Sequence, residues 1–471
     1  MTESKKLGKI KSSVFSRSLA LAKLTVNTGA SLASHSVSTL LSNADTKNEK
    51  WNSFLKGRAR EFSNELGQLK GSLMKAGQML SMYGEHFLPP EANELLKSLQ
   101  AQSPPIEWSA MEKVLRGSLS PEKLAQLEID PQSIGSASLG QVHRAKIKAT
   151  GEEIVLKIQY PGVDKAIDSD LKAIRSFLNV IQVLPKGIAT DHIFAEVREM
   201  LVQETNYIQE AEETERYRKR LEGDKRFVVP KVYFEFSGPR VIASSFERGV
   251  SPDDKLILSL NQERRNRLAM NYIDLYFKEL FEWGVVQTDP HLGNYRVRLA
   301  PDGQDQLVLL DFGAVRSYPP DFLNPYHRMI KAALENDLEE LSSAALTLNF
   351  LRDDDDPRLK KIFEEFCLVT VEPFMAGNDP REQGRLNEKG EYDWRASDLP
   401  TRLTRQVFEM IQKFKVRSPP REILFLDRKT GGVFIFLSVL GAKIKARDLF
   451  LTYLSRVPGR GTADPNTQTQ S

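Results

Sequence analysis

Apolar residues recur at helical spacing toward both ends of the chain and alternate with polar residues in its middle. The pattern is helical over residues 46–130 and mixes strands with helices over residues 131–250. It is again mostly helical over residues 251–456, apart from a short strand pair near 295–311. Residues 457–471 are polar and predict a disordered tail. The chain therefore predicts an α+β fold in two main parts, preceded by a helical extension.

Residues 1–45 differ from the rest of the chain in charge. The first 43 residues hold six lysines or arginines and one acid, Glu3, among frequent serine, threonine and alanine. Three interpretations are open: a partly ordered basic tail, a basic amphipathic helix on an anionic membrane, and a cleaved transit peptide. Arginine is scarce, which counts against the transit peptide. The basic excess predicts peripheral membrane contact.

Composition removes several classes of protein. Hydrophobic residues are 40% and charged residues 27% of the 471, so the chain can bury a sizeable core and is not wholly disordered. The net charge is only +3, which gives no indication of nucleic-acid binding. Cys367 is the single cysteine, so no intramolecular disulfide forms and a reducing compartment is expected. The longest apolar run, residues 433–442, is shorter than the roughly 20 residues that span a bilayer.

A small-residue turn is the first candidate for nucleotide chemistry. The segment IGSASLGQVHRAKIKATGEEIVLKIQ predicts a hairpin, because ATG separates two alternating runs. Before it lies a G-x-G-x-x-G spacing with alanine in the middle place, and such a turn lets backbone N–H groups approach phosphates. The candidate phosphate-binding residues are Gly135, Ser136, Ala137, Ser138 and Gly140. Taken alone, the spacing equally fits a strand turn that needs small residues.

Lys157 lies in the centre of the apolar strand that follows. A lysine there needs a partner unless it faces water on an edge strand, and both interpretations are open. A kinase places a lysine at this point to hold the α- and β-phosphates of ATP and pairs it with a helix glutamate. Residues 194–211 predict a long amphipathic helix, with Glu204 on its apolar stripe and Glu210 at the edge. Either glutamate is a candidate partner, although most glutamates on such a helix are solvated.

Two further motifs follow in the order expected of a kinase. Asp289 and Asn294 are spaced D-x-x-x-x-N, and an apolar strand ends at Asp311 in the sequence Asp-Phe-Gly. In kinases the first aspartate orients the attacking hydroxyl, whereas the asparagine and the second aspartate bind magnesium. Each motif is weak alone, but the ordered series predicts ATP and Mg²⁺ as cofactors. His291 is expected to make a structural hydrogen bond only.

One face of the predicted N-terminal helix is unusual. Gly67, Gly71, Lys75 and Gln78 lie at i, i+4, i+8 and i+11. Each glycine inside a helix costs about 1 kcal/mol relative to alanine, so their presence indicates close approach by a partner. An exposed polar face with incidental glycines is the alternative.

At these residues the chain resembles the UbiB/AarF-domain family of atypical kinase-like proteins, which includes the mitochondrial kinase-like proteins of coenzyme Q biosynthesis. The resemblance covers residues 61–454. It rests on KAGQ at Lys75–Gln78, on the alanine-containing loop at Gly135–Gly140, and on LKIQYPGV, QTDPHLGN and LLDFGA in that order. KAGQ together with the altered loop distinguishes this family from other kinases.

The resemblance implies a protein-kinase-like bilobal fold with an N-terminal helical extension over the active site. It implies binding of ATP or ADP with magnesium, slow ATP hydrolysis, and support of ubiquinone biosynthesis or related isoprenoid-lipid handling at membranes. Lys75 and Gln78 would stand where a protein substrate enters, and the loop alanine would restrain phosphoryl transfer to the protein itself. Glu210 matches the partner of the strand lysine. Glu204 matches the first acid of an E-x-D motif.

The sequence departs from the family pattern in three places. Asn206 stands where the aspartate of E-x-D is expected, so one carboxylate near Lys75 is missing. Leu292 stands where many bacterial members have proline. No C-terminal transmembrane segment is recognised, so membrane contact would use the N-terminal segment or a partner.

Three functions from different classes remain. The first is an ATP-dependent atypical kinase or ATPase, in which Lys157 and Asp289 are catalytic, Glu210 orients the lysine, and Asn294 and Asp311 hold magnesium. The second is a nucleotide-gated scaffold of a lipid-biosynthesis complex without turnover. The third is a conventional protein or small-molecule kinase, against which the loop alanine counts. Expected partners are ATP, a quinone or isoprenoid lipid and a biosynthetic complex. The expected location is cytoplasmic, peripheral to the inner membrane if bacterial, in preference to mitochondrial.

Overall fold

The computed structural model describes residues 71–87, 96, 106–137, 139–180, 190–377, 379, 381, 385–414 and 421–456. These residues divide into two compact units. Unit 1 holds the described residues up to Glu215 and the segment Lys231–Phe246, and unit 2 holds Arg216–Pro230 and the described residues from Glu247 onward. The predictions for residues 1–45 and 457–471, and those for Gly67 and Ser138, lie outside the described residues.

Unit 1 is built on a four-stranded antiparallel sheet in the order β1-β2-β3-β5. Its strands are β1 (Leu127–Ser136), β2 (Gly140–Ile147), β3 (Glu153–Gln159) and β5 (Val241–Ser245). The predicted β2–β3 hairpin is present, and its turn needs glycine because Gly151 has a φ of 76°. In β3, Ile154, Leu156 and Ile158 alternate into the core.

Strand β1 starts at Leu127, inside the segment that the sequence predicted to be helical. Leu127 and Ile129 pair with β2 opposite Ile147 and Ala145, so cross-strand packing overrides the helical spacing. The register then shifts between Ile129 and Ser133. Pro131 lies in that stretch, and proline cannot donate to a ladder, so an irregular pairing there is expected.

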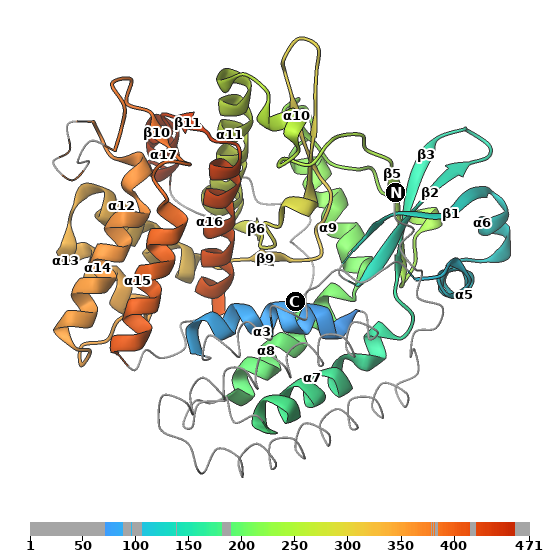
Figure 1. The fold of residues 1–471 in the computed structure, drawn as a ribbon, viewed down its shortest axis with the longest axis horizontal. Helices are drawn as coiled ribbons and strands as arrows, with labels where there is room; N and C mark the ends of the chain where they lie inside the picture. The colour runs from blue at the N-terminus through green and yellow to red at the C-terminus, as the bar shows by residue number, and fades with distance from the viewer. Residues whose placement is uncertain are drawn as a thin grey trace, which may run out of the picture. The chain divides into compact units, whose positions relative to one another are not determined.

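Unit 1 has six described α-helices and the short 3-10 helix η1 (Phe234–Phe236). The α-helices are α3 (Ser72–Phe87), α5 (Trp108–Ser118), α6 (Pro121–Ala125), α7 (Val163–Val180), α8 (Thr190–Glu204) and α9 (Tyr207–Arg220), and the unit boundary falls inside α9. Helix α3 lies alongside α7 and α8 (Figure 1). Gly71 precedes α3 with a φ of 93°, and a Cβ there would lie 2.7 Å from Val163 Cγ2. The expected close approach at this glycine is therefore real, but Gly71 is outside the helix and its neighbour belongs to the same chain.

The single helix predicted over residues 194–211 is wrong, because the structure has two helices there. Helix α8 ends at Glu204 and α9 begins at Tyr207. Asn206 caps α9: its Oδ1 accepts from Gln209 N at 3.2 Å, and its Nδ2 donates to Gln209 Oε1 at 3.4 Å. Ile208, one of the apolar residues at helical spacing in this segment, is 52% exposed.

Unit 2 is mostly helical. Its helical segments are α10 (Lys255–Leu258), α11 (Gln262–Phe277), a π-helical turn (Lys278–Trp283), η3 (Leu292–Asn294), α12 (Pro320–Glu335), α13 (Leu338–Thr347), α14 (Pro357–Thr370), η4 (Glu372–Phe374), α15 (Leu399–Lys413), α16 (Arg421–Val439) and α17 (Arg447–Leu454). One core runs through it, and Cys367 lies buried in α14, where burial raises the pKa of its thiol.

The strands of unit 2 form three small sheets. The strands are β4 (Phe227–Val228), β6 (Val285–Gln287), β7 (Tyr295–Arg298), β8 (Gln306–Leu309), β9 (Val315–Ser317), β10 (Tyr392–Asp393) and β11 (Lys443–Ile444). The predicted strand pair near 295–311 is confirmed as β7 and β8, with β4 added in parallel to β8. Strand β6 precedes this sheet's β7–β8 pair in the sequence and β9 follows it, and β6 and β9 pair with each other.

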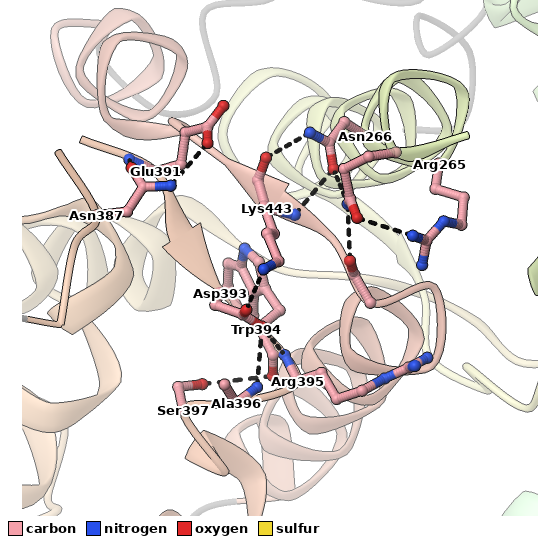
Figure 2. A network of polar contacts seen from close by, with 12 residues as sticks. Arg265, Asn266, Asn387, Glu391, Asp393, Trp394, Arg395, Ala396, Ser397 and Lys443 are labelled. Carbon is pink, nitrogen blue, oxygen red and sulfur yellow. Dashed lines mark hydrogen bonds and ion pairs between the residues drawn. The ribbon is translucent and has the colours of Figure 1, made fainter. Parts of the chain in front are cut away.

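Helix α16 is held firmly at its C-terminal end. The last carbonyls of a helix lack partners within the helix. Here Arg395 donates to Ser438 O at 3.1 Å and also to Val439 O, and Arg265 donates to Leu440 O at 2.7 Å. Figure 2 shows the network around this end, in which Asn266 makes two hydrogen bonds to the backbone of Lys443.

Lysine 443 extends the same network through its side chain. Its Nζ lies 3.0 Å from Asp393 Oδ2, while Asp393 Oδ1 accepts from the backbone of Arg395 and Ala396 (Figure 2). The strand pair β10–β11 and the end of α16 are therefore fixed to α11.

Among the described residues, no helix is both long enough and apolar enough to cross a bilayer.

Two adjacent glycines in α16 provide a matched test of its packing. A Cβ at Gly432 would lie 2.1 Å from Pro290 Cγ, whereas one at Gly431 would meet nothing within 4 Å. We expect Gly432→Ala to lower the free energy of unfolding by about 1–3 kcal/mol through overpacking. Gly431→Ala should be neutral or stabilise by up to about 1 kcal/mol. Denaturant unfolding of both variants checks this, and equal stabilities would contradict the packing.

Candidate functional site

The glycine-rich turn lies between β1 and β2 in unit 1. Ala137 N donates to Gly140 O at 2.8 Å and closes the turn. Gly135 and Ser136 are exposed, and a Cβ on Gly135 would meet nothing within 4 Å. Gly140 is different, because a Cβ there would lie 2.6 Å from Ile158 O. Gly140 therefore serves close packing, while Gly135 leaves open space at the turn.

Lys157 and Glu210 form the ion pair that the sequence suggested. Lys157 Nζ lies 2.5 Å from Glu210 Oε1, with the two side chains 18% and 6% exposed. Lys157 is not on an edge, because β3 pairs with both β2 and β5. Glu210 lies in the first turn of α9, where the amino end of a helix favours an acidic side chain. A charged lysine is thus held in place by a carboxylate that is largely removed from water.

Lys75 in KAGQ makes a second buried ion pair. Lys75 Nζ lies 2.8 Å from Glu204 Oε1, and the side chains are 3% and 12% exposed. Ser72, one turn earlier in α3, donates to Asp170 Oδ2 of α7 at 2.5 Å. Gln78 is half-buried on the same helix. Ser72 and Lys75 therefore bind α3 to α7 and α8, and the face that carries Lys75 is buried there.

Asn206 does not replace the missing acid near Lys75. It is exposed, and its side chain makes the two hydrogen bonds with Gln209 that cap α9. An asparagine is among the best residues for this position, since its short side chain accepts from the first free N–H groups of the helix. The departure from the family's aspartate therefore has a local structural role at the start of the helix that carries Glu210.

The second set of predicted residues lies in unit 2, on the loops after β6 and β8. Asn294 Nδ2 donates to Asp289 O at 3.0 Å, and Leu310 N donates to Asn294 O at 2.9 Å. Asp311 Oδ1 accepts from Gly313 N at 3.0 Å, which shapes the Asp-Phe-Gly turn. The structure thus brings Asp289, Asn294 and Asp311 onto two loops joined by backbone hydrogen bonds.

Gln287 joins the same two loops and was not identified from the sequence. Its Nε2 donates to Asp289 O at 3.0 Å and to Asp311 O at 3.3 Å. It is buried, and its backbone N donates to Glu279 Oε1 at 3.3 Å. One side-chain amide therefore sets the spacing between the two predicted aspartates. The sequence signal was a glutamine at the end of an apolar strand, immediately before the D-x-x-x-x-N motif.

Beneath Gln287 lies a completely buried ion pair. Lys429 Nζ of α16 is 2.8 Å from Glu279 Oε2 in the π-helical turn, and both side chains are 1% exposed. Burial alone would lower the pKa of Lys429, but the nearby acidic groups, Glu279 first among them, together outweigh it and the pKa is raised. Tyr217 completes the group by donating to Glu279 Oε1 at 2.9 Å. Short π-helical turns are frequent at functional sites, and this one supports the predicted catalytic loop.

Arg428 contacts the side chain of Asp289 directly and was not identified from the sequence. Its Nη2 donates to Asp289 Oδ1 at 2.5 Å, and the two side chains are 18% and 12% exposed. Arg428 lies 139 positions beyond Asp289, so no local motif connects them. The available signal was the charged run Asp427–Lys429 in the middle of a helix rich in apolar residues, since buried charges need partners.

The remaining residues of the loop have structural contacts. His291 Nδ1 accepts from Gly293 N at 3.0 Å and caps the short helix η3, which agrees with the structural hydrogen bond expected for it. Leu292 is partly buried and packs against the core of unit 2. Phe312 is buried, with its ring 4.5 Å from that of Tyr217. These contacts hold the loop in shape without adding chemical groups to it.

These features together define a class of protein. A strand lysine paired with a helix glutamate, a D-x-x-x-x-N loop and an Asp-Phe-Gly turn are the parts of a protein-kinase-like fold. The mixture of a small antiparallel sheet in unit 1 and a mainly helical unit 2 agrees with that class.

Comparison with known proteins identifies the family. The model of the ABC1 atypical kinase-like domain matches residues 98–345, just over half of the chain. The chain therefore belongs to the ABC1 atypical kinase-like family, as the KAGQ and loop motifs predicted. Helix α3 with Lys75 and helix α16 with Arg428 lie outside the matched range.

Three relatives illustrate the match. The mitochondrial atypical kinase COQ8B of Danio rerio is 32% identical over 83% of this chain and 60% of its own length. The mitochondrial atypical kinase COQ8 of Saccharomyces cerevisiae is 28% identical over 82% of this chain and 74% of its own. A solved structure of Mycobacterium tuberculosis Rv3197 with erythromycin is 25% identical, covers 88% of this chain and all of its own, and has a TM-score of 0.55.

Two of the relatives are longer than this chain and are matched over only part of their length. The chain spans about three fifths of COQ8B from Danio rerio and of COQ8 from Schizosaccharomyces pombe. The names of these relatives place them in mitochondria, so they do not support the expectation that ranked a cytoplasmic location first.

Lys75 and Glu204 allow a direct test of the buried pair on α3. Breaking a buried ion pair by removing one partner commonly costs about 3–5 kcal/mol, and exposure of Glu204 should reduce that here. We expect Lys75→Ala and Glu204→Gln each to lower the melting temperature and the double variant to lower it by less than the sum. Additive changes in melting temperature would show that the two residues do not stabilise each other.

Proposed function

We propose that this chain is an atypical kinase or ATPase that binds ATP with magnesium and turns it over slowly. The observation that carries the proposal is the Lys157–Glu210 pair at 2.5 Å on β3 and α9. A half-buried lysine whose ammonium is fixed by a carboxylate presents a positioned positive charge, which is what the α- and β-phosphates of a nucleotide require. Gly135 and Ser136, exposed on the neighbouring turn, add backbone N–H groups for the same phosphates.

The residues present fit magnesium. Asp311 offers a carboxylate and Asn294 an amide oxygen, because its Nδ2 is the atom that donates to Asp289 O. Both are the oxygen ligands that magnesium prefers. No group of three or more His, Cys, Asp or Glu in the described parts of the chain could hold a metal ion. That agrees with a cation that relies on one or two protein ligands, nucleotide phosphates and water, and neutralises phosphate charge when bound.

Asp289 is the residue that we assign to the attacking group. A carboxylate in a D-x-x-x-x-N loop positions a water or a hydroxyl for in-line attack. Arg428 holds Asp289 Oδ1 at 2.5 Å, and Gln287 and Asn294 both donate to its backbone carbonyl. The side chain and the main chain of Asp289 are therefore both fixed before a substrate arrives, which is the condition for effective positioning.

We further propose that the activity supports ubiquinone biosynthesis or related isoprenoid-lipid handling at a membrane. Support comes from the resemblance in motifs and from relatives that are named as mitochondrial COQ8 atypical kinases. The phosphoryl acceptor is either water or a group on a lipid or protein. Purified protein with ATP, with and without anionic liposomes carrying a quinone-precursor mimic, tests turnover. Binding of ATP without any hydrolysis would favour the nucleotide-gated scaffold instead.

Asp311 provides the first test of the assigned roles. Asp311→Asn removes a carboxylate ligand from a hard cation, so magnesium-dependent nucleotide binding should weaken sharply while the fold survives. Thermal shift by ATP with magnesium measures this, and Asp302→Asn on an exposed turn of unit 2 is the control. A nucleotide-induced shift that is the same in Asp311→Asn and in the unsubstituted chain would remove the assignment.

Arg428 provides the second test. Arg428→Gln should lower the rate of ATP hydrolysis by about tenfold or more, because a misplaced catalytic group commonly costs that much, while nucleotide affinity is retained. Arg428→Lys should fall between, since lysine keeps the charge but lacks the planar fork. The control is Arg358→Gln, which breaks an exposed ion pair with Asp356 on α14. Unchanged turnover in Arg428→Gln would show that its contact with Asp289 has no part in positioning.

A further inference from the structure

The segment Glu204–Glu210 connects the two buried ion pairs of unit 1. Glu204 at its start pairs with Lys75, and Glu210 at its end pairs with Lys157. Between them, Thr205 O accepts from Gln159 Nε2 at 2.9 Å. Gln159 is buried and lies two residues after Lys157 in β3. The segment Glu204–Glu210 is therefore in contact with helix α3, which carries KAGQ, and with strand β3, which carries Lys157.

Tyr207 occupies the centre of this segment. It is 1% exposed, and Lys157 Nζ lies 5.4 Å from the centroid of its ring. Its hydroxyl is only 2.5 Å from the position that a Cβ on Gly140 would take. The ring also belongs to a small core with Ile242, the residue that pairs with Lys157 on β5.

These contacts give Tyr207 two neighbours with a role in the proposed nucleotide site. A cation over an aromatic face is attracted by the ring, so Tyr207 helps to hold the Lys157 ammonium next to Glu210. Its hydroxyl lies against Gly140, the residue that ends the glycine-rich turn. Because the ring is rigid and fully buried, a displacement of the Glu204–Glu210 segment must move the ring against both.

We propose that Tyr207 is a positioning residue for nucleotide binding, through which the Lys75–Glu204 contact on α3 influences Lys157 and the turn ending at Gly140. The inference rests on the proposed function, because it takes Lys157 as the phosphate-contacting lysine. Tyr207 belongs to none of the kinase motifs, and the coupling runs through its ring. Glu204 and Glu210 fix the two ends of the segment through their ion pairs, and the Tyr207 ring between them contacts Lys157 and the position next to Gly140.

The test uses the full chain with Tyr207→Leu, Tyr207→Phe and, as a control, Ile208→Ala at the exposed neighbouring position. Dissociation constants for ATP with magnesium and melting temperatures are measured for each. Tyr207→Leu should weaken binding by about tenfold, the size expected for losing a desolvated cation–ring contact, and Tyr207→Phe should weaken it less. Ile208→Ala should leave binding unchanged. If Tyr207→Leu lowers only the melting temperature, or fails to fold while Tyr207→Phe binds as the unsubstituted chain does, the proposal is overturned.

A double-substitution cycle then tests the coupling. Lys75→Ala should change nucleotide affinity in the unsubstituted background and change it much less in the Tyr207→Leu background. The same change in both backgrounds would show that Tyr207 does not transmit the effect. This outcome differs from failure of the proposed function, in which the unsubstituted chain itself shows no nucleotide binding.

Discussion

A lysine that is withdrawn from water must have a carboxylate beside it, and this requirement organises both units. Lys75, Lys157 and Lys429 are each within hydrogen-bonding distance of a glutamate, on α8, α9 and the π-helical turn respectively. Desolvating a charge is costly, and the attraction of a close partner with further hydrogen bonds must offset it. Each pair therefore fixes the two elements that carry it, and each of those elements also carries a predicted site residue or supports one.

In unit 2 a chain of contacts connects the buried lysine to the predicted site residues. Lys429 neutralises Glu279, Glu279 accepts from the backbone of Gln287, and Gln287 holds the carbonyls of Asp289 and Asp311. Every donor in this series is buried or nearly so, which makes the hydrogen bonds strong and their loss costly. The positions of the two aspartates thus depend on a helix that follows them by more than a hundred residues in the chain.

The sequence was informative where a charge stood in an apolar pattern. The lysine in β3 and the glutamates near residues 204 and 210 could be paired because an unpaired charge there would be too costly, and the structure has those pairs. It was misleading where helical spacing continued through Asn206, since capping ended one helix and began another. Tyr207 was not identified from the sequence, and Ile208, an apolar residue at helical spacing, is exposed in the structure.

Long-range contacts were the other limit. Arg428 with Asp289 and Gly432 with Pro290 join segments far apart in the chain, and periodicity within a window contains no information on which helix packs against which loop. The strand start at Leu127 was likewise decided by pairing with β2. Motif order predicted the class of fold, whereas the helix that supports the predicted catalytic loop could be identified only from the three-dimensional structure.

The hydrogen bonds from Arg265 and Arg395 that hold the C-terminal end of α16, here called the clamp, have a consequence for Asp289. From Leu440, held by Arg265, to Arg428 the helix runs twelve residues, or about 18 Å at 1.5 Å per residue. A slip of one turn at the clamp would carry the guanidinium about 5.4 Å away, farther than any hydrogen bond reaches. Helix α16 therefore keeps a fixed distance between its C-terminal end and Arg428. Arg265 and Arg395 at that end thus contribute to the placement of the Asp289 carboxylate, which Arg428 holds near the other end of the helix.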